Sequence, residues 1–355
     1  MTTQKLVSLA AVAAVLSGLA YYSNTSKKVK TPTQSGKPVL SGLDLSDVSK
    51  IEAGPAGGKK LVLESSDAGW SIKSLFGYPA DITKIRENLL ALKDLKIGHV
   101  ATGKKLGSAA IVDLQNAAGK SLATVRLGEK HLRQPTGEME QFGGGGGFPD
   151  GRYVSAAGAD TVFLVKETLD AFDGDPKSWA DTQIVSLPAA DITAIELGCK
   201  GQTSTLTKKD GAWMLAGLTE KEEFDTSKSY GVESALNALN FNTVADPALT
   251  DAQLGMTTGA VFTVTLKSGE RYTAKIGNSV EVGTDRTFKI SGSFTPAGTN
   301  AAENATLAKK IETFNAKVGK WAYVIPSYNA ENMTKSRADL VKPKEEPKKE
   351  EPQVK

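Results

Sequence analysis

Alternating apolar and polar residues mark short strands along most of this chain. Leu61 and Leu63 alternate with polar neighbours, which is the pattern of a strand that buries one face. Residues 111–127 predict a β-hairpin that turns near Ala118 and Gly119, and residues 152–165 predict a second hairpin. These segments make the predicted body of the protein rich in strands.

Apolar residues at spacings of three and four predict a helix that begins after Asp81. Its apolar face consists of Ile82, Ile85, Leu89 and Leu92. Asp81 can cap this helix, because its side chain accepts hydrogen bonds from the first free backbone amides. Further helices are predicted near residues 167–172 and 305–318. Since strands and helices mix without regular alternation, the pattern indicates an α+β fold.

The same order of landmarks occurs twice. The motif DVSKIE starts at Asp47 and DITAIE starts at Asp191, a shift of 144 residues. Other pairs at nearly this shift are Trp70 with Trp213, Asp81 with Asp225, and Trp179 with Trp321. The second helix face repeats the first with Val232, Leu236 and Leu239. We therefore predict two tandem copies of a strand-rich module with two helices each, residues 44–188 and 189–328, with the tryptophans as packing residues.

The N-terminal segment is apolar and carries no charge from Leu6 to Ser26. A helix of about 20 residues spans a bilayer core of roughly 30 Å, so residues 1–26 predict one transmembrane anchor. The alternative is a cleaved signal peptide, since Gly18 and Ala20 offer small residues before a cut. The apolar run is longer than the roughly 7–15 residues of a signal-peptide core, which favours the anchor.

Lys5 and the free amine precede the predicted anchor and three lysines follow it, so the positive-inside rule by itself would place the body in the cytoplasm. A long C-terminal body can nevertheless translocate largely regardless of nearby charge. We therefore expect a single-pass inner-membrane protein with its body in the periplasm. Residues 27–43 have the proline, glycine and hydroxyl content of a linker. Residues 329–355 are expected to form a disordered charged tail that serves as a spacer or docking segment at most.

Charge and cysteine content narrow the function classes. The net charge is +3 and the basic residues are scattered, whereas a nucleic-acid binder usually shows a basic face, so no nucleic-acid partner is expected. The single cysteine, Cys199, allows no intrachain disulfide and no zinc site built on cysteines. It is interpreted as a small buried apolar residue. Only two histidines occur, His99 and His131, which weakens any mechanism that depends on histidine.

A glycine-rich stretch is the candidate partner-binding loop. It comprises Phe142, Gly143, Gly144, Gly145, Gly146, Gly147 and Phe148. Five consecutive glycines give the backbone high freedom and allow close approach to a partner chain. The alternative is a mobile hairpin tip with no binding role. The matching place in the second copy, near residues 280–285, is short, so the loop embellishes one copy only.

Three other motifs favour structural explanations. The tripeptide GKS at residues 119–121 is similar to the end of a P-loop, but Leu114 stands where the motif needs glycine. Asp173 and Asp175 lack the further acidic residues of a calcium loop and fit a turn that ends a helix. A third acidic run, interpreted as solvated surface, consists of Glu220, Glu222 and Glu223. We therefore predict no catalytic residue, no cofactor and no metal, and expect a protein that is not an enzyme.

The order of these motifs resembles the DUF4340 family of uncharacterised bacterial proteins. The resemblance rests on DVSKIE (47–52), LVLESSDAGWSI (61–72), YPADITKIRENLLALKDLK (78–96), SWADTQIVSL (178–187) and DITAIELG (191–198). It implies an N-terminally anchored protein with a repeated α+β body. Genes of this family often lie beside components of gliding-motility-type ABC transporters, which implies an accessory role at the envelope. The resemblance supplies no catalytic residues.

Two further functions remain open as alternatives to an accessory or binding subunit of an envelope assembly. One is an extracytoplasmic hydrolase, for which convergent carboxylates in a cleft between the copies would be the deciding feature. The other is a ligand-binding protein released after cleavage, which would be separated by whether residues 1–20 persist in the mature chain.

Overall fold

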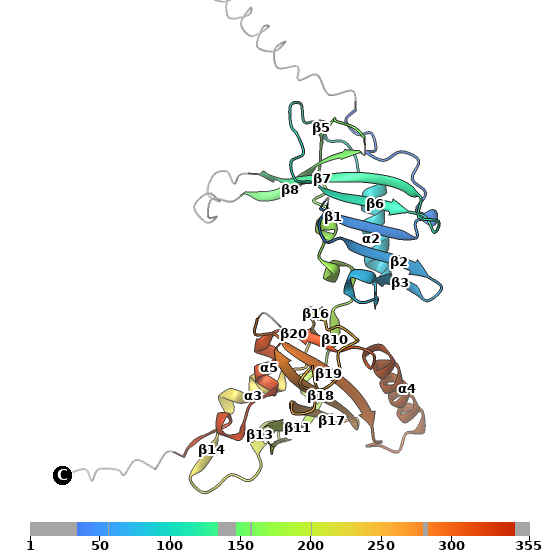
Figure 1. Cartoon of the computed structure of the whole chain (residues 1–355). Helices are drawn as coiled ribbons and strands as arrows, with labels where there is room; N and C mark the ends of the chain where they lie inside the picture. Colours follow the sequence, from blue (N-terminus) through green and yellow to red (C-terminus); the bar gives the residue numbers. More distant parts are fainter. Residues whose placement is uncertain are drawn as a thin grey trace, which may run out of the picture. The chain divides into compact units, whose positions relative to one another are not determined.

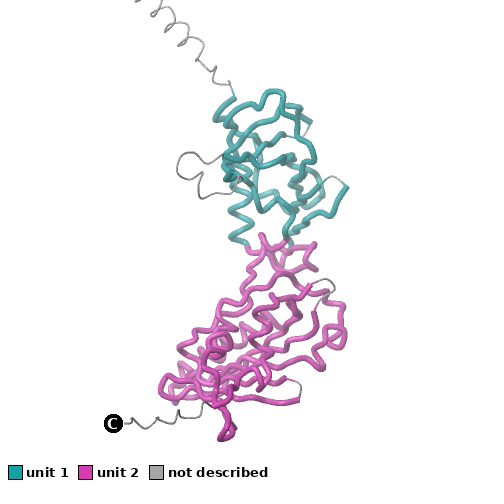
Figure 2. Tube along the Cα trace, turned by 90° about the vertical axis from the view of Figure 1, so that its left-hand side faces the viewer, with its two compact units in different colours: residues 1–66, 82–175 teal, residues 67–81, 176–355 magenta. Residues whose placement is uncertain are grey.

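The computed structural model describes residues 34–344 apart from 56, 134–146, 157, 200 and 280–282 (Figure 1). The described residues form two compact units (Figure 2). Unit 1 lies within residues 1–66 and 82–175, and unit 2 within residues 67–81 and 176–355. The predicted α+β class is confirmed, because both units are rich in strands and carry helices. No helix in the described ranges is long and apolar enough to cross a bilayer, and the predicted anchor, residues 1–26, lies outside them.

Unit 1 is built on one antiparallel sheet. Its strands are β1 (Lys50–Pro55), β2 (Leu61–Ser66), β5 (His99–Val100), β6 (Ala110–Gln115), β7 (Ser121–Arg133), β8 (Phe148–Ala156) and β9 (Phe163–Val165). They lie in the order β2-β1-β6-β7-β8-β9-β5, and each neighbouring pair is antiparallel. Ile51 pairs with Leu63 on one side and Leu114 on the other, and all three are buried. Alternation along the strands thus gives the sheet one apolar face.

The predicted helix after Asp81 is present as α2 (Ile82–Lys93), which crosses one face of this sheet (Figure 1). It buries Ile85, Leu89 and Leu92, whereas Ile82 is exposed. The helix expected near residues 167–172 is wrong. Only one 3-10 turn, Asp170–Asp173, forms there, because left-handed residues Leu169 (φ 54) and Gly174 (φ 100) bound it on both sides.

The predicted linker, residues 27–43, is also shorter than expected. Gly36 and Val39 donate backbone hydrogen bonds to Ile97 and Leu95, and Pro38 bridges Lys96 in antiparallel fashion. Residues 36–39 therefore belong to unit 1. Proline and glycine are typical of a linker, but backbone pairing holds residues 36–39 against the edge of the fold.

Unit 2 is built on a second antiparallel sheet. Its strands are β11 (Ile192–Cys199), β12 (Gln202–Lys209), β13 (Ala212–Leu215), β16 (Thr243–Val244), β17 (Ala260–Leu266), β18 (Glu270–Ser279), β19 (Arg286–Phe294) and β20 (Tyr323–Ile325). Their order is β13-β12-β11-β17-β18-β19-β20-β16. The predicted helix near residues 305–318 is present as α4 (Ala301–Val318) and packs on β19, where Asn315 exchanges hydrogen bonds with both backbone groups of Gly292.

Smaller strands complete unit 2. They are β3 (Gly69–Ile72) with β4 (Tyr78–Pro79), β10 (Gln183–Val185) with β15 (Leu239–Asn240), and β14 (Glu222–Phe224) with β21 (Val341–Pro343). Tyr78 meets Phe241, Trp321 and Tyr323 edge-on, with ring centroids 5.2, 4.9 and 6.3 Å away. The segment 67–81 therefore contributes to the aromatic core of unit 2, although its ring partners follow more than 160 residues later in the sequence.

Two expectations for the second half of the chain need correction. The helix expected to carry Val232, Leu236 and Leu239 is reduced to α3 (Ser229–Glu233), because Ala238 adopts a left-handed backbone (φ 50) and Leu239 enters β15. The tail expected from residue 329 is ordered as far as residue 344. It forms α5 (Ser327–Met333), a 3-10 turn (Arg337–Asp339) and β21, anchored by the buried residues Ala330, Met333 and Leu340.

The tryptophans have unequal environments. Trp179 is fully buried, whereas Trp70, Trp213 and Trp321 are half-buried. Trp70 lies in β3 and Trp213 in β13, so this repeat-related pair occupies short strands in both halves of the chain. Cys199, expected to be buried, is half-exposed at the end of β11.

Candidate functional site

The candidate partner-binding loop lies mostly outside the described residues. Phe142 to Gly146 fall in the gap, and Gly147 and Phe148 are described. Phe148 begins β8, pairs with Arg133 and is 57% exposed. Binding by this loop therefore stays a prediction.

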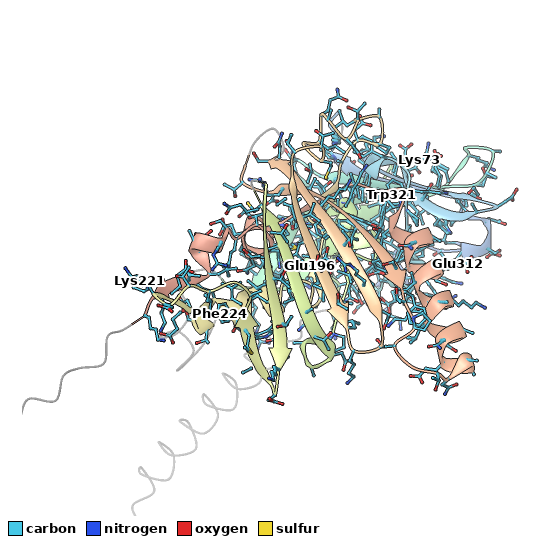
Figure 3. All side chains as sticks on the ribbon, turned by 90° about the horizontal axis from the view of Figure 1, so that it is seen from below. Lys73, Glu196, Lys221, Phe224, Glu312 and Trp321 are labelled. Atoms are coloured by element: carbon cyan, nitrogen blue, oxygen red, sulfur yellow. The ribbon has the colours of Figure 1, made fainter. Side chains whose placement is uncertain are left out.

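The acidic motifs singled out in the sequence serve in ion pairs. Asp173 contacts the buried Arg152 (Nη1–Oδ1 2.6 Å) and Lys130 (3.1 Å) in unit 1. In unit 2, Glu222 contacts Arg337 at 2.9 Å. Glu222 begins the short strand that ends at Phe224, and Figure 3 labels Phe224 and the preceding Lys221. In the parts of the chain that the structure describes, no three His, Cys, Asp or Glu side chains converge as metal ligands.

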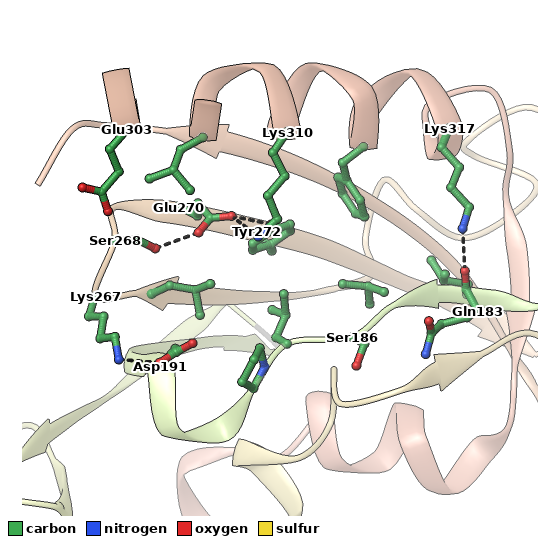
Figure 4. Close-up of a pocket in the computed structure, with 17 residues that line it drawn as sticks. Gln183, Ser186, Asp191, Lys267, Ser268, Glu270, Tyr272, Glu303, Lys310 and Lys317 are labelled. Atoms are coloured by element: carbon green, nitrogen blue, oxygen red, sulfur yellow. Dashed lines mark hydrogen bonds and ion pairs between the residues drawn. The ribbon is translucent and has the colours of Figure 1, made fainter. Parts of the chain in front are cut away.

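A groove of about 530 Å³ in unit 2 is the candidate site (Figure 4). Helix α4 forms one wall, residues 183–188 form the other, and the ends of β17 and β18 lie between them. Its apolar lining includes Ile184, Leu187, Leu266, Tyr272, Leu307 and Phe314. Leu307, Lys310 and Phe314 share one face of α4, because their spacings are three and four residues.

A buried carboxylate, Glu270, lies in this groove. Tyr272 and Lys310 donate to its Oε1 at 3.0 and 2.9 Å, and Ser268 donates to its Oε2 at 2.7 Å. Glu270 and Tyr272 project to the same side of β18 because they are two residues apart. Gly269, with φ 94, makes the turn that brings Ser268 beside Glu270.

Hydrogen bonding decides the charge state of Glu270. Burial alone raises the pKa of its carboxyl, but hydrogen bonds from Ser268, Lys310 and Tyr272 outweigh burial, so the pKa lies below its ordinary value. Burial and the neighbouring carboxylate raise the pKa of Tyr272, so this phenol stays protonated and keeps donating. Glu270 is therefore an ionised group whose hydrogen-bonding capacity is largely taken up.

Two further lysines lie on the rim of the groove. Lys267 contacts Asp191 at 2.6 Å, and Lys317 contacts Asp181 at 2.8 Å. Lys317 also donates to the backbone carbonyl of Gln183 at 2.9 Å. The rim is thus charged and paired, above an apolar floor.

Replacing Glu270 by glutamine is expected to weaken unit 2 in a pH-dependent way. Glu270→Gln keeps the side-chain shape but removes the charge that Lys310 contacts, so the free energy of unfolding should fall by about 1–3 kcal/mol near neutral pH. Because the folded-state pKa of Glu270 is lowered from 4.5, its contribution is present above that pH and is lost as the pH falls through the folded value.

The measurement is urea unfolding of both proteins at a series of pH values from neutral to acidic. The wild type should lose more stability on acidification than Glu270→Gln. Glu196→Gln is the matched control, since Glu196 pairs with Arg271 at 2.9 Å at a partly exposed position, and it should change little (Figure 3). Identical acid slopes for wild type and Glu270→Gln would contradict the role assigned to this carboxylate.

Sequence reasoning did not identify this groove. Glu270 and Lys310 are 40 residues apart, and no motif links them. One signal was present: Glu270 occupies an inward position of the strand that also points Tyr272, Ala274 and Ile276 inward. A charged residue at such a position is buried only when it is paired.

Comparison with known proteins supports the family suggested by the motifs. The family described as "Domain of unknown function (DUF4340)" matches residues 70–257, more than half of the 355-residue chain. No curated protein and no solved structure matches this chain. The matched range begins in β3, runs through β16 and ends before β17. This chain therefore belongs to the DUF4340 family.

Proposed function

We propose that this protein is a membrane-anchored, extracytoplasmic binding subunit of an envelope assembly associated with an ABC-type transporter, and that it is not an enzyme. The observation that carries the binding role is the groove of unit 2, with an apolar floor and a paired, charged rim. Such a lining suits recognition, because apolar surface supplies affinity and a few placed polar groups supply specificity.

The state of Glu270 favours binding over catalysis. A general acid or base works best with a pKa near the operating pH, which burial of a carboxyl can provide. Here three donors hold the carboxylate ionised, and its pKa is lowered instead of raised. The group is therefore suited to holding Lys310 in place on α4, not to exchanging protons with a substrate.

The anchor completes the proposal. Residues 6–26 carry no charge, and the fold begins with the backbone pairing of residues 36–39. The nine intervening residues, 27–35, span at most about 30 Å when extended. Unit 1 would then lie within this reach of the membrane surface. The short tether suits a subunit that works beside membrane-embedded partners.

We also propose that the body arose by duplication of one module. The seven-strand order β2-β1-β6-β7-β8-β9-β5 in unit 1 corresponds to β12-β11-β17-β18-β19-β20-β16 in unit 2. The Asp81 amide donates to the Trp179 carbonyl, and the Asp225 amide donates to the Leu340 carbonyl, at 2.8 and 2.9 Å. These matched bonds pair Trp179 with Leu340, so the earlier pairing of Trp179 with Trp321 is replaced. They also extend the second copy to about residue 343.

Topology is the first test. An alkaline phosphatase fused after Lys30 should be active in cells, and a reporter that works only in the cytoplasm should be silent at the same place. Activity of the cytoplasmic reporter would remove the extracytoplasmic assignment.

Partner contact is the second test. A photo-crosslinking amino acid at Glu303, on the groove, should capture an envelope protein in cells that express the full chain. The same probe at Glu312, an exposed position of α4 that does not line the groove, is the matched control (Figure 3). Equal capture from both positions, or capture from neither, would contradict the binding role of the groove.

A further inference from the structure

One wall of the groove is the backbone of an edge strand. Six consecutive residues, 183–188, line it, and β10 occupies the first three. On one side β10 pairs with β15, through Gln183 with Asn240 and Val185 with Leu239. The other side faces α4 across the groove (Figure 4). Edge strands of this kind are templates for pairing with a further chain.

Side chains occupy the outward backbone groups of Gln183 on this edge. The Gln183 amide donates to Asp181 Oδ1 at 3.1 Å, and its carbonyl accepts from Lys317 Nζ at 2.9 Å. Asp181 and Lys317 also contact each other at 2.8 Å. Charged side chains commonly protect an exposed strand edge in this way. Such contacts can be exchanged for backbone hydrogen bonds, because partly exposed ion pairs contribute little free energy.

The chemistry around the edge indicates which strand would fit. The apolar side chains of Leu266, Leu307 and Phe314 line the groove beside it. On the rim, Lys267 and Lys310 are the outer members of their ion pairs. The side chains of Lys267 and Lys310 are 67% and 58% exposed, whereas those of Asp191 and Glu270 are 35% and 3% exposed. At these two pairs an approaching chain meets the ammonium group before the carboxylate. In the third pair the side chain of Asp181 is 55% exposed and that of Lys317 43%, and Glu303 adds one more acidic group at the rim.

We propose that the outer edge of β10 takes one extended, acidic peptide segment of a partner protein as an added strand. Alternate side chains of that segment would enter the apolar floor, and its acidic side chains would lie against Lys267 and Lys310. Main-chain pairing would supply affinity, and the floor and the lysines would supply selectivity. This inference rests on the proposed binding role of the groove and names the chemistry of its partner.

The test uses two short synthetic peptides, acetylated and amidated, and the full chain in detergent. One alternates glutamate with valine, and the other replaces each glutamate by lysine. The glutamate peptide should bind, and hydrogen exchange should slow at the amides of residues 183–186. The lysine peptide should bind at least tenfold more weakly, because its charges meet the rim lysines. Equal binding of the two peptides, or binding without protection of residues 183–186, would overturn the proposal.

Charge reversal separates the rim from the rest of the surface. Lys267→Glu should weaken binding of the glutamate peptide about three- to tenfold, because it turns an attraction into a repulsion. Lys309→Glu is the control, since Lys309 is exposed on α4 and does not line the groove, and it should change binding less than twofold. Equal loss in both variants would reduce the effect to net charge and overturn the assigned site.

The outcome is separable from the proposed function. If photo-crosslinking from Glu303 captures a partner but the glutamate peptide does not bind, the binding role stands and strand addition fails. If the peptide binds but no partner is captured in cells, strand addition at β10 stands as a property of the protein, and the proposed binding of an envelope partner in the groove fails.

Discussion

Replacing Tyr78 by alanine is expected to destabilise unit 2 by about 3–5 kcal/mol, the usual cost of deleting a buried aromatic side chain. Tyr78 is 5% exposed and packs against Phe241, Trp321 and Tyr323. The loss combines buried apolar surface with three edge-on ring contacts. Hydrogen exchange checks it, since amides around residues 239–245 and 321–325 should exchange faster although residue 78 lies far away in the sequence.

Tyr230→Ala is the matched control. Its side chain is 78% exposed, so removing it should leave exchange in the same segments unchanged. If Tyr78→Ala accelerated exchange only within residues 67–81, the aromatic contacts would not stabilise unit 2, and the assignment of that segment to its core would be wrong.

Trp179→Ala and Leu340→Ala are expected to destabilise unit 2 strongly and by similar routes. Both residues are fully buried, and each carbonyl accepts from the aspartate amide that precedes the first helix of its copy. Cavity formation should cost about 3–5 kcal/mol for the tryptophan and about 2–5 kcal/mol for the leucine. Thermal unfolding of each variant measures the effect directly.

Tyr328→Ala, at a position that is 65% exposed, is the control and should keep the melting temperature within a degree or two of the wild type. If Trp179→Ala were destabilising and Leu340→Ala were neutral, the two positions would not be equivalent. The proposed duplication would then lose the hydrogen-bond match on which its revised pairing depends.

Local patterns predicted the elements whose signals are themselves local. The apolar spacing after Asp81 gives α2, and the alternation around residues 111–127 gives the β6–β7 hairpin. Errors arose where tertiary contacts or backbone strain override such patterns. Ala238 and Leu169 have left-handed backbone conformations that shorten the expected helices. Glycine is the usual residue at such positions, so an alanine or a leucine gives no sequence signal for a left-handed conformation. The ordered segment 329–344 looked polar because its three buried anchors are widely spaced.

The candidate site was harder to predict than the fold. Its walls come from residues 183–188, from the turn at residue 269 and from α4, and the first and last of these segments are more than 100 residues apart. In the sequence, the one indication of a site is a charged residue, Glu270, at an inward-facing strand position. Its partner Lys310 cannot be identified from the sequence, because the chain has many other lysines. The glycine-rich stretch is unusual in composition. Consecutive glycines indicate high backbone freedom, but they do not indicate which chemical groups a partner would contact.

The position of Tyr78 also sets the order of events when the chain is made. Its partner Tyr323 follows 245 residues later, which at about 5–20 residues per second is roughly 12–50 s of synthesis. During that interval Tyr78 cannot contact Trp321 or Tyr323, because these residues have not been synthesised. The strand β14 likewise cannot pair until β21 has been made. Unit 2 can therefore close only after residues 321–343 have been synthesised, and until then the apolar surface around Tyr78 lacks these partners.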